Sequence, residues 1–284
     1  MSPETTIPSV ALGHRSTAGV SVPQLGFGVW QVPEDEVDSA VATALEVGYR
    51  HIDTARIYAN EEGVGRALAA SGLPRDDVFV TTKVWNDDHH RVREAFDASM
   101  ERLGLDVLDL FLIHWPAPGQ DAYVDAWRQL LELQESGRVR SVGVCNFHVP
   151  HLERLLDETG VLPSINQIEL HPYLQQEELR TFHAEHGIVT EAWSPLASGK
   201  EVLGDATITQ IAAKHGVTPA RAIIRWHLQL GNVVIPKSVT PSRIAENFDV
   251  FGFELDADDL QAIAALDRGM RTGPNPDAFW ASQR

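Results

Sequence analysis

Four side chains that can move or orient a proton follow three short apolar runs of the sequence. An ammonium beside a phenol favours the phenolate, so we expect Lys83 to lower the pKa of Tyr58 from its usual value near ~10 and make it a better general acid. Asp53 would keep Lys83 protonated, and a neutral His114 could donate a hydrogen bond to a substrate oxygen. Because no nucleophile is paired with a base, acyl transfer is disfavoured. The set is Asp53, Tyr58, Lys83 and His114.

Taken singly, each of these residues could satisfy backbone groups or lie at a solvated strand end. Their spacing, however, fits a fold in which the ends of several strands lie close together. Short apolar runs alternate with amphipathic helical runs eight times over the 284 residues. Strand followed by helix requires parallel strands, and eight such units in this length favour a closed (β/α)8 TIM barrel over an open doubly wound sheet. In this α/β barrel the four residues would meet at the C-terminal face, where active sites lie.

The open-sheet alternative also lacks its dinucleotide-binding fingerprint. The nearest match to GxGxxG, residues 26–31, has no third glycine. We expect residues 1–284 to form a single barrel domain. A short N-terminal hairpin at residues 8–24 could plug one end of the barrel, and a C-terminal tail is predicted to cross the active-site face.

The limits of the predicted elements follow from apolar periodicity and capping signals. Asn60 is the predicted N-cap of the helix that follows Tyr58, and Glu61 and Glu62 suit the positive end of that helix. The expected strands span 25–29, 49–52, 78–82, 108–113, 139–144, 165–168, 188–193 and 233–235. The expected helices span 35–47, 60–70, 89–103, 121–134, 150–159, 176–186, 208–215, 219–230, 241–248 and 256–266.

The composition fits a globular enzyme and disfavours several other classes of protein. Hydrophobic residues make up 43% of the chain and charged residues 22%, and no run reaches the ~18 to 20 apolar residues that span a bilayer. No secretory signal is recognisable at the N-terminus, so we expect a cytoplasmic protein. The one cysteine, Cys145, can form neither an internal disulfide nor a cysteine metal cluster. A net charge of −17 argues against a nucleic-acid partner, and an anionic ligand would need local cations.

The remaining strand ends carry binding groups in place of further acids and bases. Asn146 and Gln167 are amides that donate and accept, which suits a carboxamide ligand better than a metal ion. Trp193 offers a flat face for stacking, although core packing for the ring and loop capping for the amides remain open. Residues 236–243, PKSVTPSR, combine hydroxyls, a helix N-terminus and two cations. This segment therefore predicts a phosphate site, at the place where barrels of this type commonly bind phosphate.

Three motifs make the chain resemble the aldo-keto reductase family over essentially its whole length. They are GYRHIDTARIYANEEGVG at 48–65, RSVGVCNF at 140–147 and IPKSVTPSRIAEN at 235–247. The resemblance implies NADPH/NADP+ as the cofactor, preferred over NADH, and a small carbonyl compound as the substrate. It further implies that Tyr58 donates a proton to the carbonyl oxygen, within a tetrad with Asp53, Lys83 and His114, while the nicotinamide delivers hydride to the carbon.

The same resemblance implies a set of cofactor contacts. Asn146 and Gln167 would hold the carboxamide, and Trp193 would stack on the nicotinamide. Residues 194–206 are a candidate lid over the cofactor phosphates. The other implied contacts are Ser194, Leu196 and Val239 along the cofactor, Lys237, Ser238 and Arg243 on the 2′-phosphate, and Glu246 and Asn247 at the adenine.

The chain departs from the commoner family pattern at two positions. Cys145 replaces a frequent Ser, which weakens one possible hydrogen bond to the carboxamide, and Trp193 replaces a frequent Tyr. With a tryptophan at this position, the chain resembles the prokaryotic branch of the family that is similar to the 2,5-diketo-D-gluconate reductases. The loop after His114 is short, so we expect an open substrate mouth. An aromatic wall beside His114 is predicted from Trp30, Trp85, Trp115, Phe279 and Trp280, with simple packing as the alternative.

Two other functions remain as alternatives at this stage. A nicotinamide-binding sensor or auxiliary subunit could use the same barrel, although a pure binder does not need the tetrad. A metal-dependent barrel hydrolase would depend on the histidines, but His89-His90 and His183/His186 are expected at a helix start and on an exposed helix, so no metal is predicted. Aldehydes, dicarbonyls, keto sugars and aromatic aldehydes all remain possible substrates. A monomer is the family-based expectation.

Overall fold

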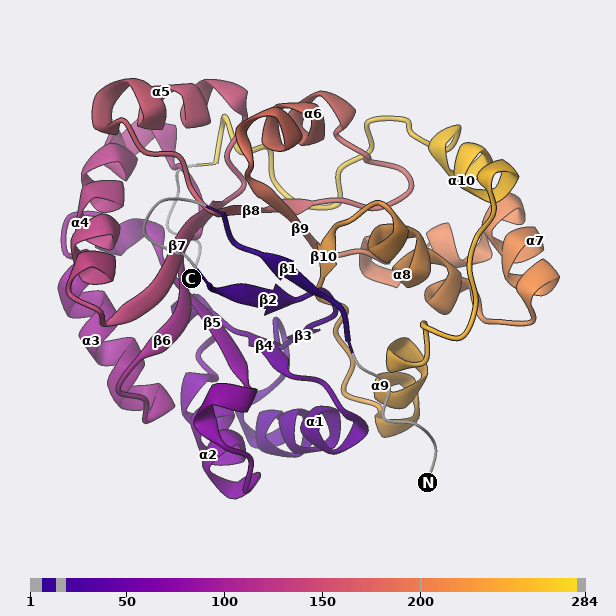
Figure 1. The fold of residues 1–284 in the computed structure, drawn as a ribbon, viewed down its shortest axis with the longest axis horizontal. Helices are drawn as coiled ribbons and strands as arrows, with labels where there is room; N and C mark the ends of the chain where they lie inside the picture. Colours follow the sequence, from indigo (N-terminus) through magenta and orange to yellow (C-terminus); the bar gives the residue numbers. More distant parts are fainter. Residues whose placement is uncertain (1–6, 14–18, 200, 280–284) are drawn as a thin grey trace.

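Eight parallel strands curl into a barrel that helices surround (Figure 1). The computed structural model describes residues 7–13, 19–199 and 201–279. Neighbouring strands follow chain order, and the ring closes where Gly26 N donates to the Val234 carbonyl and Val234 N donates to the Gln24 carbonyl, each at 2.9 Å. The predicted barrel is confirmed. Its strands are β3 (Phe27–Gly28), β4 (His51–Asp53), β5 (Phe79–Val84), β6 (Leu108–Ile113), β7 (Val139–Cys145), β8 (Ile165–Glu169), β9 (Val189–Trp193) and β10 (Val233–Val234).

The helices lie close to their predicted positions, since each has an apolar face that packs on the barrel. The largest difference is at the helix predicted from residue 89, which begins at Val92 because a 3₁₀ turn, Asn86–Asp88, comes first. None of the helices in the described ranges is long and apolar enough to cross a membrane. The helices are α1 (Glu34–Val47), α2 (Glu61–Ala70), α3 (Val92–Leu103), α4 (Tyr123–Glu135), α5 (Val149–Thr159), α6 (Glu177–His186), α7 (Ala206–His215), α8 (Pro219–Gln229), α9 (Pro241–Phe248) and α10 (Ala257–Ala264).

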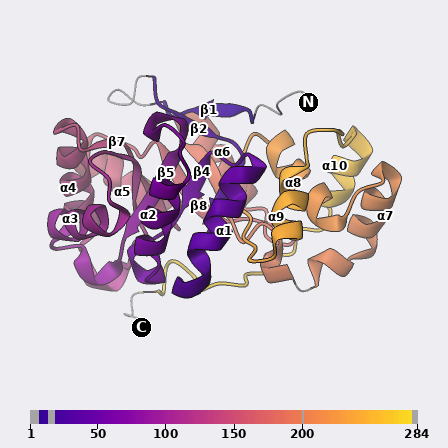
Figure 2. The same ribbon diagram turned by 90° about the horizontal axis from the view of Figure 1, so that it is seen from below.

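An antiparallel hairpin closes the N-terminal end of the barrel. Its strands are β1 (Ser9–Ala11) and β2 (Ser21–Pro23). Val22 is fully buried and packs in one cluster with Phe79 and Val233, which lie at the starts of their strands. The hairpin and the C-terminal tail lie at opposite ends of the molecule (Figure 2). The hairpin therefore acts as the predicted plug and leaves the other end for chemistry.

Period-two alternation decides which strand residues face the barrel interior. In β6, Leu110 and Leu112 pack with the inner cluster, whereas Phe111 and Ile113 pack with the helices outside. The inner cluster is apolar toward the hairpin. Toward the C-terminal ends the inward positions become polar, and they include Asp53, Lys83, Gln167 and Glu191, all buried.

Asn60 precedes α2 as predicted, but its side chain does not cap that helix. Its amide nitrogen instead donates to the carbonyl oxygens of Val29 and Val32, at 2.9 and 3.0 Å. Its amide oxygen accepts a hydrogen bond from Thr54 Oγ1 at 3.1 Å. Asn60 therefore ties the loop after β3 to the loop after β4, which carries Tyr58.

Candidate active site

An ion pair between Asp53 and Lys83 lies at the C-terminal end of the barrel. Lys83 Nζ donates to Asp53 Oδ1 at 2.6 Å and to the Thr54 carbonyl oxygen at 2.8 Å. Both side chains are buried. The prediction that the strand ends before Lys83 is wrong, because β5 continues through Val84. Lys83 thus projects into the barrel interior and is no solvated strand-end residue.

Tyr58 and His114 face each other above this ion pair. Tyr58 ends a 3₁₀ turn, Arg56–Tyr58, and its ring centroid lies 5.2 Å from Lys83 Nζ. The rings of Tyr58 and His114 have their centroids 5.6 Å apart in an edge-to-face arrangement. His114 follows β6 and donates its backbone N–H to the Val84 carbonyl at 3.1 Å. The four predicted residues are therefore brought together.

Burial strongly affects the pKa values of the tetrad residues. It raises the pKa of Tyr58 more than the Lys83 charge lowers it, so the predicted net lowering of this pKa is wrong. Burial also lowers the pKa of Lys83, but Asp53 and Tyr58 raise it by more, and the ammonium stays charged. Burial raises the pKa of Asp53, and Lys83 opposes that rise. The phenol consequently keeps its proton and lies beside a permanent cation.

His114 is neutral, as expected, because burial and the Lys83 charge lower its pKa well below the ordinary value. Its Nδ1 is buried without a hydrogen-bond partner among the described residues. A proton on Nδ1 would have no acceptor, so the tautomer protonated on Nε2 is favoured. Nε2–H is then the donor available to a ligand oxygen.

Asn146 links His114 to Trp193. Its amide nitrogen donates to the His114 carbonyl oxygen at 3.0 Å, and its amide oxygen accepts from Trp193 Nε1 at 2.8 Å. Asn146 has a φ of 63°, a left-handed conformation that asparagine tolerates better than most residues. Asn146, directly after β7, therefore holds the indole of Trp193 in a defined orientation.

Gln167 and Glu191 form a second polar layer below the ion pair. Gln167 Nε2 donates to Asp53 Oδ2 at 2.9 Å and to Glu191 Oε2 at 3.0 Å. Both N–H bonds of the amide thus point at carboxylates, which leaves its carbonyl oxygen for a ligand amide. The strand predicted at 165–168 extends one residue farther, since β8 continues to Glu169.

Glu191 is a site residue that the sequence reasoning missed. Burial, followed by the Asp53 charge, raises its pKa to about 8. Glu191 lies two positions before Trp193 in one strand, so period-two alternation places its side chain in the barrel interior and would have found it. Cys145 also faces this interior, and burial raises the pKa of its thiol well above the ordinary value, which makes it unreactive.

The segment after β10 presents two cations at the start of α9. Lys237 and Arg243 are exposed, and neither forms an ion pair with a carboxylate of the described chain. Ser238 is buried, and its Oγ accepts from Thr240 N at 3.1 Å. Val239 is 40% exposed beside them. This is the arrangement expected of a phosphate site, in a protein of net charge −17.

The other predicted cofactor residues make contacts within the protein. Thr218 Oγ1 donates to Glu246 Oε1 at 2.5 Å, so this carboxylate is already bound at the start of α8. Asn247 is buried. Ser194 Oγ accepts from Ser198 N at 3.2 Å, and Leu196 packs against the main core.

Aromatic rings surround the mouth of the site. Phe279 packs on Trp115, with ring centroids 4.5 Å apart, and lies 6.2 Å from Trp85. Trp115 in turn lies 6.4 Å from Trp193. Trp30 is 50% exposed and has no ring contact with the other described aromatic residues. Trp280 lies outside the described residues.

Comparison with known proteins decides the family. The model of the aldo/keto reductase family matches residues 24–268. The chain belongs to this family. Methylglyoxal reductase DkgA of Escherichia coli (strain K12) is 58% identical over 262 residues, which cover 92% of this reductase and 95% of that protein. The predicted membership is confirmed, and the chain is an oxidoreductase.

Solved structures agree with the fold of the reductase. A mutant of Gox0644 in complex with NADPH is 52% identical with a TM-score of 0.88, covering 92% of this reductase and 96% of that chain. A Bombyx mori aldo-keto reductase in complex with NADP is 34% identical with a TM-score of 0.87, covering 96% of this reductase and 97% of that chain.

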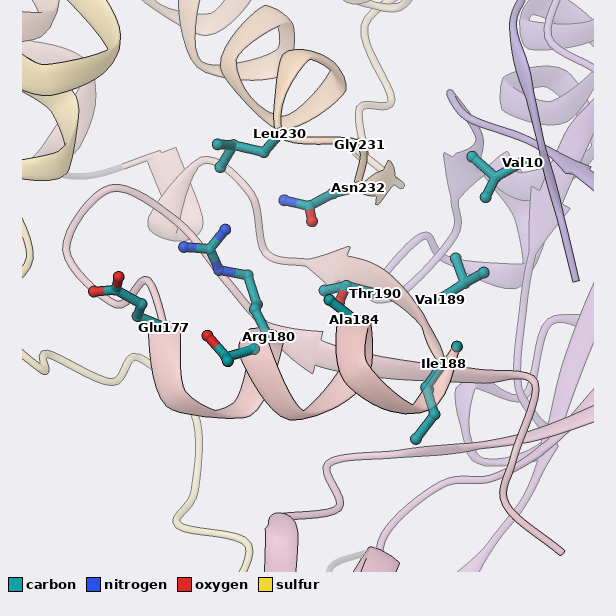
Figure 3. A pocket seen from close by; sticks show the side chains of 12 residues that line it. Val10, Glu177, Arg180, Ala184, Ile188, Val189, Thr190, Leu230, Gly231 and Asn232 are labelled. Atoms are coloured by element: carbon teal, nitrogen blue, oxygen red, sulfur yellow. The ribbon is translucent and has the colours of Figure 1, made fainter. Parts of the chain in front are cut away.

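A separate hollow of about 490 Å³ lies away from these residues (Figure 3). It is bordered by Val10 of the hairpin, Arg180 of α6, Thr190 at the start of β9 and Asn232 before β10. None of the predicted site residues lines it. The hollow thus lies near the starts of β9 and β10, whereas the tetrad lies at the C-terminal ends of the strands.

Several histidines outside the tetrad are buried in the protein. Within the described ranges, no group of three His, Cys, Asp or Glu side chains could hold a metal ion. The prediction that His183 is exposed is wrong. His183 is buried, with Nε2 3.0 Å from Asn166 Nδ2 and Nδ1 2.9 Å from Thr190 Oγ1. His89 is also fully buried.

Proposed function

We propose that the protein is an NADPH-dependent carbonyl reductase in which Tyr58 is the general acid. The chain is an NADP-dependent aldo/keto reductase by family, and two solved neighbours hold NADPH or NADP. The observation that supports the role of Tyr58 is the buried Lys83 ammonium, which is paired with Asp53 and lies 5.2 Å from the phenol ring. Among the described residues this is the arrangement best suited to donate one proton to a ligand oxygen.

Each residue of the tetrad would have one task. Tyr58 is neutral because burial raises its pKa, and it would give its proton to the carbonyl oxygen. Lys83 would stabilise the phenolate that remains, while Asp53 keeps the ammonium in place. His114 Nε2–H would donate to the same carbonyl oxygen, which fixes its direction and stabilises developing negative charge.

The residues at this end of the barrel fit the cofactor. NADPH supplies hydride to the carbonyl carbon when it is bound. Asn146 and the free oxygen of Gln167 would hold its carboxamide, and Trp193 would stack on the nicotinamide. The 2′-phosphate would meet Lys237, Ser238 and Arg243, and the adenine Glu246 and Asn247, with Ser194, Leu196 and Val239 along the cofactor.

A small dicarbonyl such as methylglyoxal is the substrate class we propose. A relative 58% identical to this chain is named methylglyoxal reductase. The wall of Trp85, Trp115 and Phe279 would enclose a small carbonyl compound beside His114. The monomeric state, the cytoplasmic location and the single domain over residues 1–284 stay predictions.

Loss of NADPH absorbance tests the function directly. The panel contains methylglyoxal, phenylglyoxal, an aromatic aldehyde and a diketo sugar acid, and is repeated with NADH. We expect turnover with NADPH that is fastest on the dicarbonyls. Binding of NADPH without reduction of any carbonyl would overturn the proposal and favour the sensor.

Arg243→Ala tests the phosphate site. We expect the Kd of NADPH to rise roughly 10-fold or more, with a much smaller change for NADH, because only NADPH has the 2′-phosphate. Fluorescence titration measures both constants. Arg128→Ala removes a cation that is paired with Asp125 on α4 and serves as the control. Equal weakening of both cofactors by Arg243→Ala would contradict the assignment.

A further inference from the structure

The chain segment after α10 is hydrogen-bonded through Met270 N to the Tyr173 carbonyl oxygen and, farther along, to a buried carboxylate. Glu169, the last residue of β8, accepts hydrogen bonds on Oε1 from Thr272 N at 2.5 Å and Thr272 Oγ1 at 2.6 Å. Its Oε2 accepts from Gly273 N at 3.2 Å. We call Glu169 with Arg271, Thr272 and Gly273 the tail latch.

A charged carboxylate suits this position better than an amide. Burial alone would raise the pKa of Glu169, but the hydrogen bonds from His171 and Thr272 lower it below the ordinary value. Arg271 lies 3.9 Å from Oε2 and also contacts His148, with Nη2 3.0 Å from its Nε2. An amide at position 169 would turn an N–H toward at least one of these donors.

The latch lies directly against Trp193. A Cβ atom at Gly273 would lie 2.5 Å from Trp193 Cη2, so only glycine permits this approach. Trp193 is bonded to Asn146, and Trp115 lies 6.4 Å away. Farther along the tail, Phe279 packs on Trp115. The latch therefore places the tail against the indole, and the tail reaches the aromatic wall farther along, at Phe279.

We propose that Glu169 is a positioning residue that, through the tail latch, seats the C-terminal tail against Trp193 and so places Phe279 in the substrate wall. Glu169 then governs substrate affinity and leaves the proton transfer to the tetrad. The inference rests on the proposed function in one respect, namely that the wall binds the carbonyl substrate.

Glu169→Gln tests the latch by two independent measurements. The first is hydrogen–deuterium exchange of the Thr272 and Gly273 amides, which needs no turnover. We expect exchange to become about 10- to 100-fold faster, the factor that corresponds to loss of a charge-assisted hydrogen bond. The second is kinetics with methylglyoxal, where KM should rise about 10-fold while kcat and the Kd of NADPH change less than about threefold.

Two further variants distinguish a specific loss of the tail latch from a general loss of structure. Thr272→Val removes one donor from an exposed residue and should shift exchange and KM in the same direction by a smaller factor. Asp277→Asn changes a 57% exposed carboxylate on the same tail that contacts His148, and should alter either value less than about twofold. Thermal unfolding followed by circular dichroism compares the folded state of each variant.

Unchanged exchange in Glu169→Gln would overturn the latch. Faster exchange with unchanged KM, or an equal fall in kcat and kcat/KM, would overturn its positioning role for the substrate. If the unmodified protein reduces no carbonyl at all, the proposed function and the role of the wall both fail. In that case the exchange measurement still decides whether Glu169 holds the tail.

Discussion

At the scale of single residues, the described part of the barrel interior holds two acids, Asp53 and Glu191, beside the cation Lys83. Lys83 pairs with Asp53, and Gln167 joins Asp53 to Glu191. Glu191 Oε1 has no hydrogen-bond partner in the described part of the chain. A second buried anion would be poorly compensated there, which is the physical reason for the raised pKa of Glu191.

The protonation of Glu191 predicts a pH-dependent stability. Its pKa rises from 4.5 to about 8 on folding, so the native state binds this proton more tightly than the unfolded state. The resulting stabilisation is full below the unfolded pKa and is lost as the pH rises through about 8. Glu191→Gln should lack this loss. When the pH is raised from about 5 to about 8, the parent should therefore lose a few kcal/mol of its free energy of unfolding relative to the variant.

Urea denaturation at both pH values measures this difference. Glu177→Gln changes an exposed acid and serves as the control. Parallel stability curves for Glu191→Gln and the parent protein would contradict a protonated Glu191.

At the scale of elements, two glycines explain how α2 is seated after the Tyr58 loop. A Cβ at Gly65 would lie 2.6 Å from the Leu103 carbonyl oxygen at the end of α3. A Cβ at Gly63 would collide with Val37 of α1. Helix α2 therefore packs closely on both neighbours, and together with Asn60 this fixes where the preceding loop presents Tyr58.

Gly65→Ala tests this close approach. Alanine favours a helix over glycine by about 1 kcal/mol, so propensity alone predicts a gain in stability. We expect instead a net loss of about 1 to 3 kcal/mol, because the added methyl meets backbone that cannot rotate away. Urea denaturation checks this value. At Gly252 a Cβ meets nothing within 4 Å, so Gly252→Ala should change stability by less than about 0.5 kcal/mol. A Gly65→Ala protein as stable as the parent would refute the packing argument.

At the scale of the whole molecule, the two ends of the barrel have different tasks. The hairpin fills the N-terminal end with apolar side chains, and the tail lies across the end that holds the tetrad (Figure 2). Elsewhere on the surface arginines pair with carboxylates, as Arg66 does with Asp38. Lys237 and Arg243 remain unpaired within the described chain, which suits an anionic ligand despite the net charge of −17.

The sequence predicted the barrel and the meeting of the tetrad, because periodicity locates strands and parallel strands share one C-terminal face. It did not predict the net pKa of Tyr58, because that value depends on how deeply the ring is buried. The contacts of Glu169 with Thr272 and Gly273 join residues about a hundred positions apart, and no local pattern announces them. Glu191 is different, because period-two alternation from Trp193 suffices to place it in the barrel interior.

Turnover of Tyr58→Phe with NADPH and methylglyoxal tests whether Tyr58 is the proton donor. We expect turnover to fall roughly 10²- to 10⁴-fold, the contribution of a positioned general acid, with NADPH affinity within about twofold of the parent. Tyr49→Phe, a buried tyrosine whose hydroxyl makes one long bond of 3.4 Å to Ile244, should retain turnover. Turnover in Tyr58→Phe equal to that of the parent would contradict Tyr58 as the proton donor.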